Sequence, residues 1–133
     1  METESTKSQY LLLFRGSHWD KGLSPEELQK GMDKFTAWFE KLQCKLKSGQ
    51  ALEQEGRLVS GRNGSVVSDG PFAESKEAIG GYFLLELDSF EEALAIAKGC
   101  PFLQYGSSIE VRPIAAECAT MTRVKERLAV AAA

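Results

Sequence analysis

The stretch GYFLLELDSFEEALAIAKGCP, residues 81–101, contains a strand and a helix together with the signals that bound them. Residues 80–88 form a short apolar run of the length of a buried strand. Ser89 follows as a helix N-cap, and Glu92 stands three positions later, so the pair has the pattern of a capping box. A helix is therefore predicted up to Lys98, before the Gly-Cys-Pro that ends it.

An earlier stretch repeats this pattern. QYLLLFRG, residues 9–16, resembles GYFLLELD, and its apolar part, residues 9–14, predicts a second buried strand. Ser24, Pro and Glu27 then supply an N-cap, a first-turn proline and a capping box. The helix behind them is predicted to end near Gly49, because one apolar stripe runs through Leu28, Met32, Phe35, Phe39, Leu42 and Leu46.

Three further strands complete the pattern. Residues 51–60 and 65–68 are predicted to pair as a hairpin around Gly61-Arg62-Asn63-Gly64, since Asn-Gly is a strong hairpin signal. Residues 107–114 predict a last strand, and Pro113 near its end is typical of an edge position.

The repeated order of strand, helix and strand predicts an α+β fold, a ferredoxin-like split β-α-β sandwich. Two helices would cover one face of a four- or five-stranded sheet. The other face would expose apolar side chains unless another subunit covered it, so we expect a homodimer with the sheets face to face. The predicted domain spans residues 8–114, after a flexible N-terminus at 1–7. Residues 115–133 form an extension, with a short helix that frays from about residue 128.

The composition excludes several functions. The chain has 133 residues and a net charge of −3, so no overall basic footprint points to nucleic acid. No apolar run approaches membrane-spanning length, and the polar start does not resemble a signal peptide. Three widely separated cysteines and one histidine provide neither a disulfide framework nor a metal site. We expect a cytoplasmic protein that binds no membrane and no metal.

The segment DGPFAESKEAIGGY, residues 69–82, is the strongest candidate for a site. Asp69 opens it in a turn, and a carboxylate buried next to an apolar ring has a raised pKa suited to moving a proton. His18, the only histidine, follows the first strand and is the second candidate catalytic residue. The candidate substrate-binding residues are Asp20, Phe72, Glu74, Lys76 and Tyr82. Several have simpler alternatives: His18 as a surface loop residue, Asp69 as a turn cap, Glu74 and Lys76 as solvated surface, and Tyr82 as core. Phe72 would anchor the loop by burial.

These stretches together resemble the YCII-related proteins, and DGPFAESKE resembles the motif of their DGPF branch. The likeness extends over residues 8–114. It implies a dimeric α+β barrel of ferredoxin-like subunits, in which a His-Asp pair has been proposed as an acid-base site. It also implies a regulatory alternative, because genes for some DGPF proteins lie beside alternative sigma factors.

Two functions follow from the residues and the resemblance. The first is a cofactor-free enzyme whose pocket holds a compact polar metabolite while His18 or Asp69 moves a proton, as in isomerase or lyase chemistry. The second is a noncatalytic module that senses a ligand or contacts a regulatory protein. The same fold serves both kinds of function.

Overall fold

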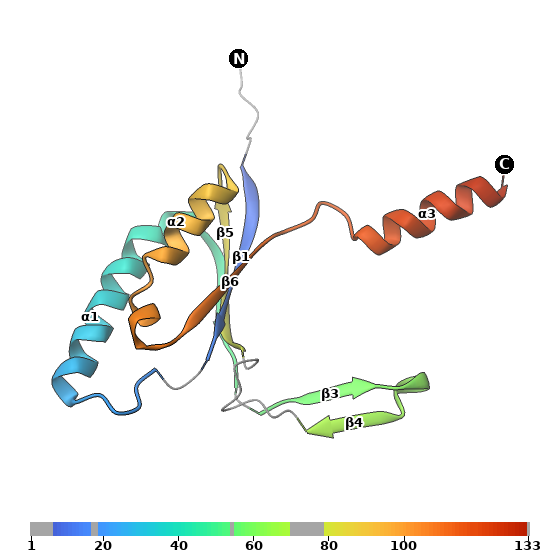
Figure 1. Cartoon of the computed structure of the whole chain (residues 1–133). Helices are drawn as coiled ribbons and strands as arrows, with labels where there is room; N and C mark the ends of the chain where they lie inside the picture. The colour runs from blue at the N-terminus through green and yellow to red at the C-terminus, as the bar shows by residue number, and fades with distance from the viewer. Residues whose placement is uncertain (1–6, 17–18, 54, 70–78, 133) are drawn as a thin grey trace, which may run out of the picture.

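The computed structural model describes residues 7–16, 19–53, 55–69 and 79–132. Within them, a four-stranded antiparallel sheet has the strand order β2-β5-β1-β6, and two helices, α1 and α2, cover one face (Figure 1). The sheet consists of β1 (Ser8–Arg15), β2 (Leu46–Ala51), β5 (Ile79–Leu87) and β6 (Ser108–Pro113). The helices are α1 (Pro25–Leu42), α2 (Phe90–Lys98) and α3 (Ala119–Ala132), and a separate hairpin pairs β3 (Arg57–Ser60) with β4 (Val66–Asp69).

The connections β1-α1-β2 and β5-α2-β6 are the two halves of the ferredoxin-like α+β arrangement that the sequence predicts. The two strands whose sequences look alike lie side by side at the centre of the sheet, where Leu12 is opposite Phe83 and Tyr10 is opposite Leu85. β6 is an edge strand, as Pro113 indicated.

The hydrophobic core lies between this central pair of strands and the two helices. Leu12 and Leu85 are fully buried, and Ala93 and Ala97 bring α2 close to the sheet. The indole N–H of Trp38 on α1 donates a hydrogen bond of 2.9 Å to the carbonyl oxygen of Ile96, so the helices are also joined to each other. Burial of these apolar surfaces is the main favourable term in the stability of such a layer.

Both helix starts are as predicted. The Ser24 hydroxyl accepts from the Glu27 amide, and the Glu27 carboxylate accepts from the Ser24 amide, which makes a complete capping box. At α2 the Ser89 hydroxyl accepts from the Glu92 amide, but the Glu92 carboxylate accepts from the amide of Asp88 instead of Ser89. The second box is therefore displaced by one residue.

The predicted end of α1 is wrong. The helix ends at Leu42, a single 3-10 turn follows, and Leu46 begins β2, in which Gly49 is an internal residue. Leu46 extends the apolar spacing of the helix in the sequence because its side chain also packs against the core. Its backbone, however, belongs to a strand. The strand predicted over residues 51–60 is likewise divided between the end of β2 and β3, with β3 in the hairpin.

The second face of the sheet has no helix over it in the described part of the chain. Side chains alternate along a strand, so Leu11 and Leu13 of β1 point to the side opposite the buried Leu12. On β5, Tyr82 pairs with Leu13 and Leu84 pairs with Leu11. We call these four half-buried side chains the open face.

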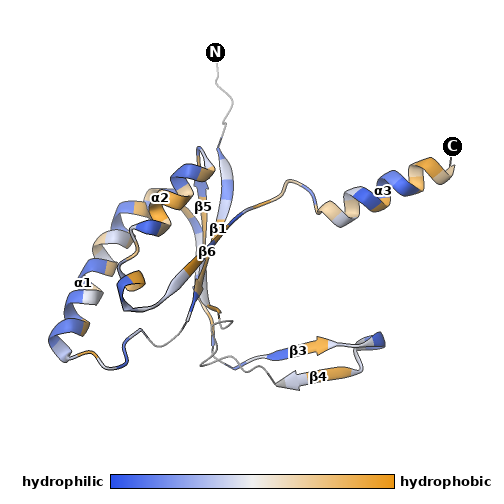
Figure 2. Ribbon diagram, viewed as in Figure 1, coloured by the Kyte–Doolittle hydropathy of each residue, from blue (hydrophilic) through white to orange (hydrophobic). Residues whose placement is uncertain are grey.

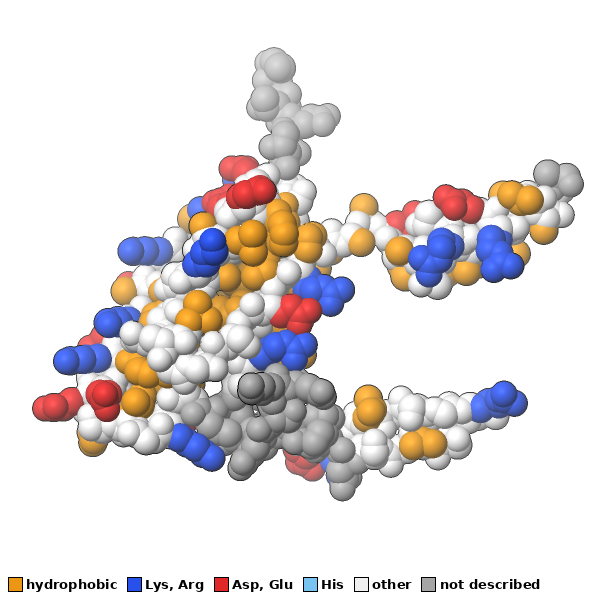
Figure 3. Space-filling view, viewed as in Figure 1, with side chains coloured by type: hydrophobic (Ala, Val, Ile, Leu, Met, Phe, Trp, Pro, Cys, Tyr) orange, Lys and Arg blue, Asp and Glu red, His pale blue; other side chains and the backbone are white. Residues whose placement is uncertain are grey.

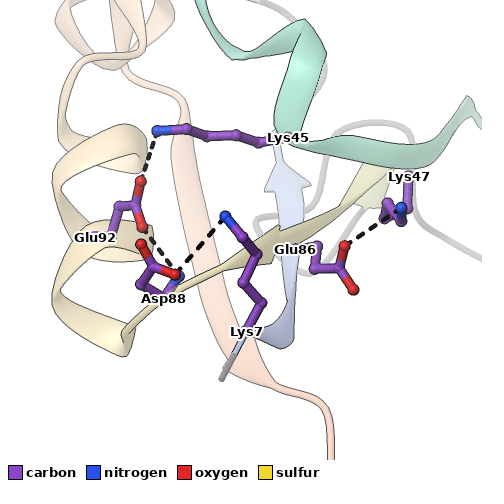
Figure 4. Close-up of polar contacts among 6 residues, drawn as sticks. All are labelled: Lys7, Lys45, Lys47, Glu86, Asp88 and Glu92. Atoms are coloured by element: carbon purple, nitrogen blue, oxygen red, sulfur yellow. Dashed lines mark hydrogen bonds and ion pairs between the residues drawn. The ribbon is translucent and has the colours of Figure 1, made fainter. Parts of the chain in front are cut away.

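Three ion pairs lie near one end of the sheet: Lys7 with Asp88, Lys47 with Glu86, and Lys45 with Glu92 (Figure 4). The Lys45 ammonium is 2.5 Å from the Glu92 carboxylate and joins the start of β2 to α2. This hydrogen bond, with a second from the Asp88 amide, holds the pKa of Glu92 below its usual range, and the same bond raises the pKa of Lys45.

In the described ranges no helix has the length and apolar character needed to cross a membrane.

Replacing Glu92 with Gln should lower stability in a pH-dependent way. Because the pKa of Glu92 is lowered in the folded state, its stabilising contribution is present above the ordinary value of 4.5 and is lost as pH falls through the folded value. The pair is partly exposed, so the difference from wild type should be at most about 1 kcal/mol.

Chemical denaturation at pH 7, 5, 4 and 3 measures this difference. The gap between wild type and Glu92→Gln should be constant above about pH 5 and close toward pH 3. Glu91→Gln, at the exposed neighbouring position, is the control and should show no such closure. A gap that stays constant down to pH 3 would contradict the assignment.

Candidate functional site

A cavity of about 520 Å³ lies between α1 and the end of the sheet where β1 finishes and β5 begins. Its walls come from β1, α1, β2, β5, β6, the residues after β1 and the 3-10 helix Pro101–Tyr105. A volume of this size is within the range of small-molecule sites. We call it the aromatic cavity, because seven of the nineteen described residues that line it are aromatic: Phe14, Trp19, Phe35, Phe39, Tyr82, Phe83 and Phe102.

One wall is a stack of three rings. Phe102 lies between Trp19 and Phe35, with ring centroids 4.2 and 4.7 Å away and interplanar angles of 17° and 2°. The three rings come from three separate segments of the chain. Offset stacking of this kind adds about 0.5–1.5 kcal/mol per pair beyond the burial of area. The stack makes this wall apolar and holds its rings in place.

The sheet supplies a second aromatic wall. Phe14 of β1 and Phe83 of β5 meet edge to face, with centroids 4.8 Å apart and an angle of 79°. Phe39 of α1 packs against Phe83 at 5.6 Å. These rings continue the same inward-facing row as the buried Leu12 and Leu85, so the cavity is an extension of the core that side chains do not fill.

Glycines keep the walls close together. A Cβ on Gly81 would lie 2.7 Å from the carbonyl oxygen of Gln50, and one on Gly49 would lie 2.8 Å from the Phe83 ring. On α1, a Cβ on Gly31 would lie 3.2 Å from Trp19. Gly31 is buried under the indole, which explains a glycine inside a helix, where it otherwise costs about 1 kcal/mol relative to alanine.

The described residues that line the cavity include few polar side chains. Among the described residues that line it, Arg15, Tyr82 and Cys100 are the titratable ones. Arg15 donates from Nε and Nη2 to one carboxylate oxygen of Glu110, at 2.9 and 2.7 Å. Hydrogen bonds from Arg15, and then from Arg112, hold the pKa of Glu110 below its usual range. The Arg15 charge is thus already paired at the edge of the cavity.

Cys100 is not suited to nucleophilic attack. It is buried, and burial raises the pKa of its thiol from the ordinary value of 9.0. The thiol therefore stays protonated near neutral pH, whereas a nucleophilic cysteine needs a lowered pKa. Cys100 contributes an apolar wall.

Tyr82 is the only residue from the predicted site that the described residues place in the cavity wall. Asp20 is exposed and does not line the cavity. The backbone of Asp69 ends β4 opposite Arg57. His18, Phe72, Glu74 and Lys76 lie outside the described residues.

The chain neighbours of these residues do line the cavity. Gly16 and Trp19 flank residues 17–18, and Gly80 and Gly81 follow soon after the DGPF segment. No metal-binding group of three or more His, Cys, Asp or Glu side chains is present in the part of the chain that the structure describes.

Sequence reasoning missed the aromatic walls. It assigned Phe35 and Phe39 to core packing on the helix stripe, and it gave Trp19 and Phe102 no role. One signal was present in the sequence, namely Gly31 in the middle of a strong helix pattern, because an interior glycine often marks a close approach. The pairing of Trp19 with Phe102 has no local signal, since the two residues lie far apart in the chain.

Among the comparisons with known proteins, one domain model shows a family. The model of the YCII-related domain matches residues 17–117. An uncharacterized protein of Rhizobium meliloti (strain 1021) is 42% identical over 52 residues, which are 38% of this chain and 42% of that protein. The chain thus spans less than half the length of this relative.

A structural likeness also exists to 5-chloro-2-hydroxyhydroquinone dehydrochlorinase from Burkholderia phenoliruptrix AC1100, solved with 2,5-dihydroxybenzoquinone. The identity is 19% and the TM-score 0.45, with 80% of this chain and 93% of the other covered.

Gly81→Ala should destabilise the protein by about 1–3 kcal/mol, because its Cβ would meet a backbone carbonyl that cannot rotate away. Gly80→Ala is the matched control. A Cβ there would make only ordinary contacts, the nearest at 3.8 Å, so we expect a change within about 0.5 kcal/mol. Urea denaturation of both variants measures the difference. Equal stability of the two would contradict the close approach of β2 and β5.

Proposed function

The chain belongs to the YCII-related family, and from this premise we propose that the aromatic cavity binds a flat, largely apolar small molecule and that His18 and Asp69 move a proton on it. The observation that carries the proposal is the cavity itself, with its stacked rings and few polar groups. DGPFAESKE at residues 69–77 supports membership of the DGPF branch.

The walls favour a different ligand from the compact polar metabolite expected from the sequence. A polar molecule would lose its hydration against Phe14, Phe83 and Phe102 and would find few hydrogen-bond partners among the described residues that line the cavity. A planar aromatic ring would instead bury apolar surface against the aromatic walls, in stacked or edge-to-face contact. Ser107, which also lines the cavity, is available to orient a polar substituent.

The proton-transfer role of His18 rests on its neighbours in the chain. Trp19 lies in the triple stack, and Gly16 also lines the cavity, so the segment that carries His18 starts and ends at the site. A histidine titrates near neutral pH and can serve as acid and base without a cofactor. Asp69 ends β4 and opens the DGPF segment that leads back to the cavity at Gly80. A carboxylate would orient the imidazole or take the proton itself.

A thermal-shift screen with matched compounds tests binding. Benzoate and phenol should raise the midpoint, whereas cyclohexanecarboxylate and cyclohexanol, which lack the flat ring, should raise it less. At 100 times Kd, binding adds about 2.7 kcal/mol, which corresponds to several degrees in a domain of this size.

Ala51→Phe should abolish the shift, because Ala51 lines the cavity and the new ring would occupy it. Ala116→Phe makes the same change at an exposed position after β6 and should leave binding unaltered. Equal responses to the flat and saturated compounds, or equal loss in both variants, would contradict an aromatic site.

Proton transfer is tested separately, by NMR in D₂O with a flat ketone that the screen identifies, starting with 2-indanone. The protein should accelerate exchange of the hydrogens beside the carbonyl, and His18→Asn or Asp69→Asn should lower this rate by about a hundredfold while binding persists. Binding with no accelerated exchange would favour the noncatalytic, ligand-sensing alternative.

A further inference from the structure

A second hollow lies between α1 and the end of α2. Its volume is about 570 Å³, and its described lining comes from these two helices and from the 3-10 helix Pro101–Tyr105. Three of the lining residues are exposed lysines, Lys34 and Lys41 on α1 and Lys98 on α2. Basic side chains gather on the helix side of the molecule in Figure 3, and hydrophilic residues recur along α1 in Figure 2. We call this hollow the lysine groove.

The positive charge of the lysine groove is not neutralised within the described part of the chain. No Asp or Glu is among the described residues that line it, and none of its three lysines forms an ion pair with a described residue. Lys45 and Lys47, by contrast, are paired with Glu92 and Glu86. Like charges that share one hollow repel, and a bound anion would replace this repulsion with attraction.

Helix electrostatics explain only part of this arrangement. Lys41 and Lys98 lie in the last turns of α1 and α2, where a positive charge interacts favourably with the helix dipole. Lys34 lies near the middle of α1, where the dipole effect has fallen off. The three lysines therefore have the hollow in common, and not a position at a helix end.

Small residues leave the space between the lysines open. Ala37 lies on α1 between Lys34 and Lys41, which start about 10 Å apart along the helix axis. Across the groove, a Cβ on Gly99 would lie 3.5 Å from the indole of Trp38, so the end of α2 approaches α1 closely there. Lysine side chains have flexible four-carbon stems, so the ammonium groups can converge over Ala37.

The rest of the lining is largely apolar. Trp38, Pro101 and Leu103 are half-buried and Cys100 is buried, and Gln104 is the only other polar side chain among the described lining residues. The indole N–H of Trp38 already donates to a backbone carbonyl. The lysine groove thus combines a cluster of positive charge with an apolar surface beside it.

We propose that the lysine groove is a second ligand site, which binds a small organic phosphate. The phosphate group lies among the ammonium groups of Lys34, Lys41 and Lys98, and a short apolar chain packs against Pro101 and Leu103. A phosphate group carries close to two negative charges near neutral pH and accepts hydrogen bonds at three oxygens. Lysine binds phosphate as a point charge, so three ammonium groups can surround it without a fixed planar geometry.

This site does not depend on what the aromatic cavity binds. Cys100 lines both hollows, so a probe of the lysine groove must be one that the aromatic cavity does not favour. Butyl phosphate meets this need, because it has the charge and a short apolar chain but no ring. 1-Butanol has the same chain without the charge and is the matched neutral compound.

An NMR titration of the full chain labelled with ¹⁵N tests the proposal. Butyl phosphate should shift the amide signals of Ala37, Gly99 and Leu103 in a saturable way, 1-butanol should not, and added sodium chloride should weaken the binding. Lys98→Gln should raise the dissociation constant about fivefold. Lys30→Gln changes an exposed lysine of α1 outside the groove and should alter the constant within about twofold.

A second pair of variants tests the shape of the site. Ala37→Leu should fill the lysine groove and abolish the shifts, whereas Ala95→Leu makes the same change at an exposed position of α2 outside it. Ala51→Phe, which fills the aromatic cavity, should leave butyl phosphate binding unchanged.

Three results would overturn the proposal: no saturable shifts with butyl phosphate, equal dissociation constants for Lys98→Gln and Lys30→Gln, or loss of binding in Ala51→Phe. Benzoate titrated into the same samples reports on the aromatic cavity, so failure of the phosphate site is distinguishable from failure of the proposed function.

Discussion

The fold depends on the antiparallel pairing of β1 with β5. These strands bring Leu12 and Leu85 into one buried row beneath α1 and α2, and the same row ends in Phe14 and Phe83. Because the row continues beyond the part that the helices fill, the core opens into a cavity at that end of the sheet. The site is therefore built from the same inward-facing positions that stabilise the domain, and changes in its walls alter stability as well as binding.

The opposite side of the same two strands has a different role. Alternation places Leu11 and Leu84 on the open face, where the described part of the protomer has no covering layer. Tyr82 belongs to that side of β5, yet it also lines the aromatic cavity.

Much of the fold could be predicted from the sequence, because its signals are local. Repeated apolar runs, the Ser24 cap and the Asn-Gly hairpin each act over a few residues. The end of α1 could not be predicted from the sequence. Leu46 falls at the next position of the helical stripe of apolar residues, but its backbone pairs with β5. The aromatic walls also escaped prediction, because Trp19 and Phe102 meet only through the tertiary fold. α3 ends at Ala132, and the alanines of its last turns favour a helix because alanine has the highest helix propensity.

The central claim is that the unfilled end of the core is a ligand site for flat molecules. The most direct measurement is a crystallographic fragment screen of the unmodified chain with a library divided equally between planar aromatic and saturated ring compounds. Planar fragments should occupy the aromatic cavity, with a ring against Phe102 or Phe83. A cavity that stays free of planar fragments, or that takes saturated rings equally often, would contradict it.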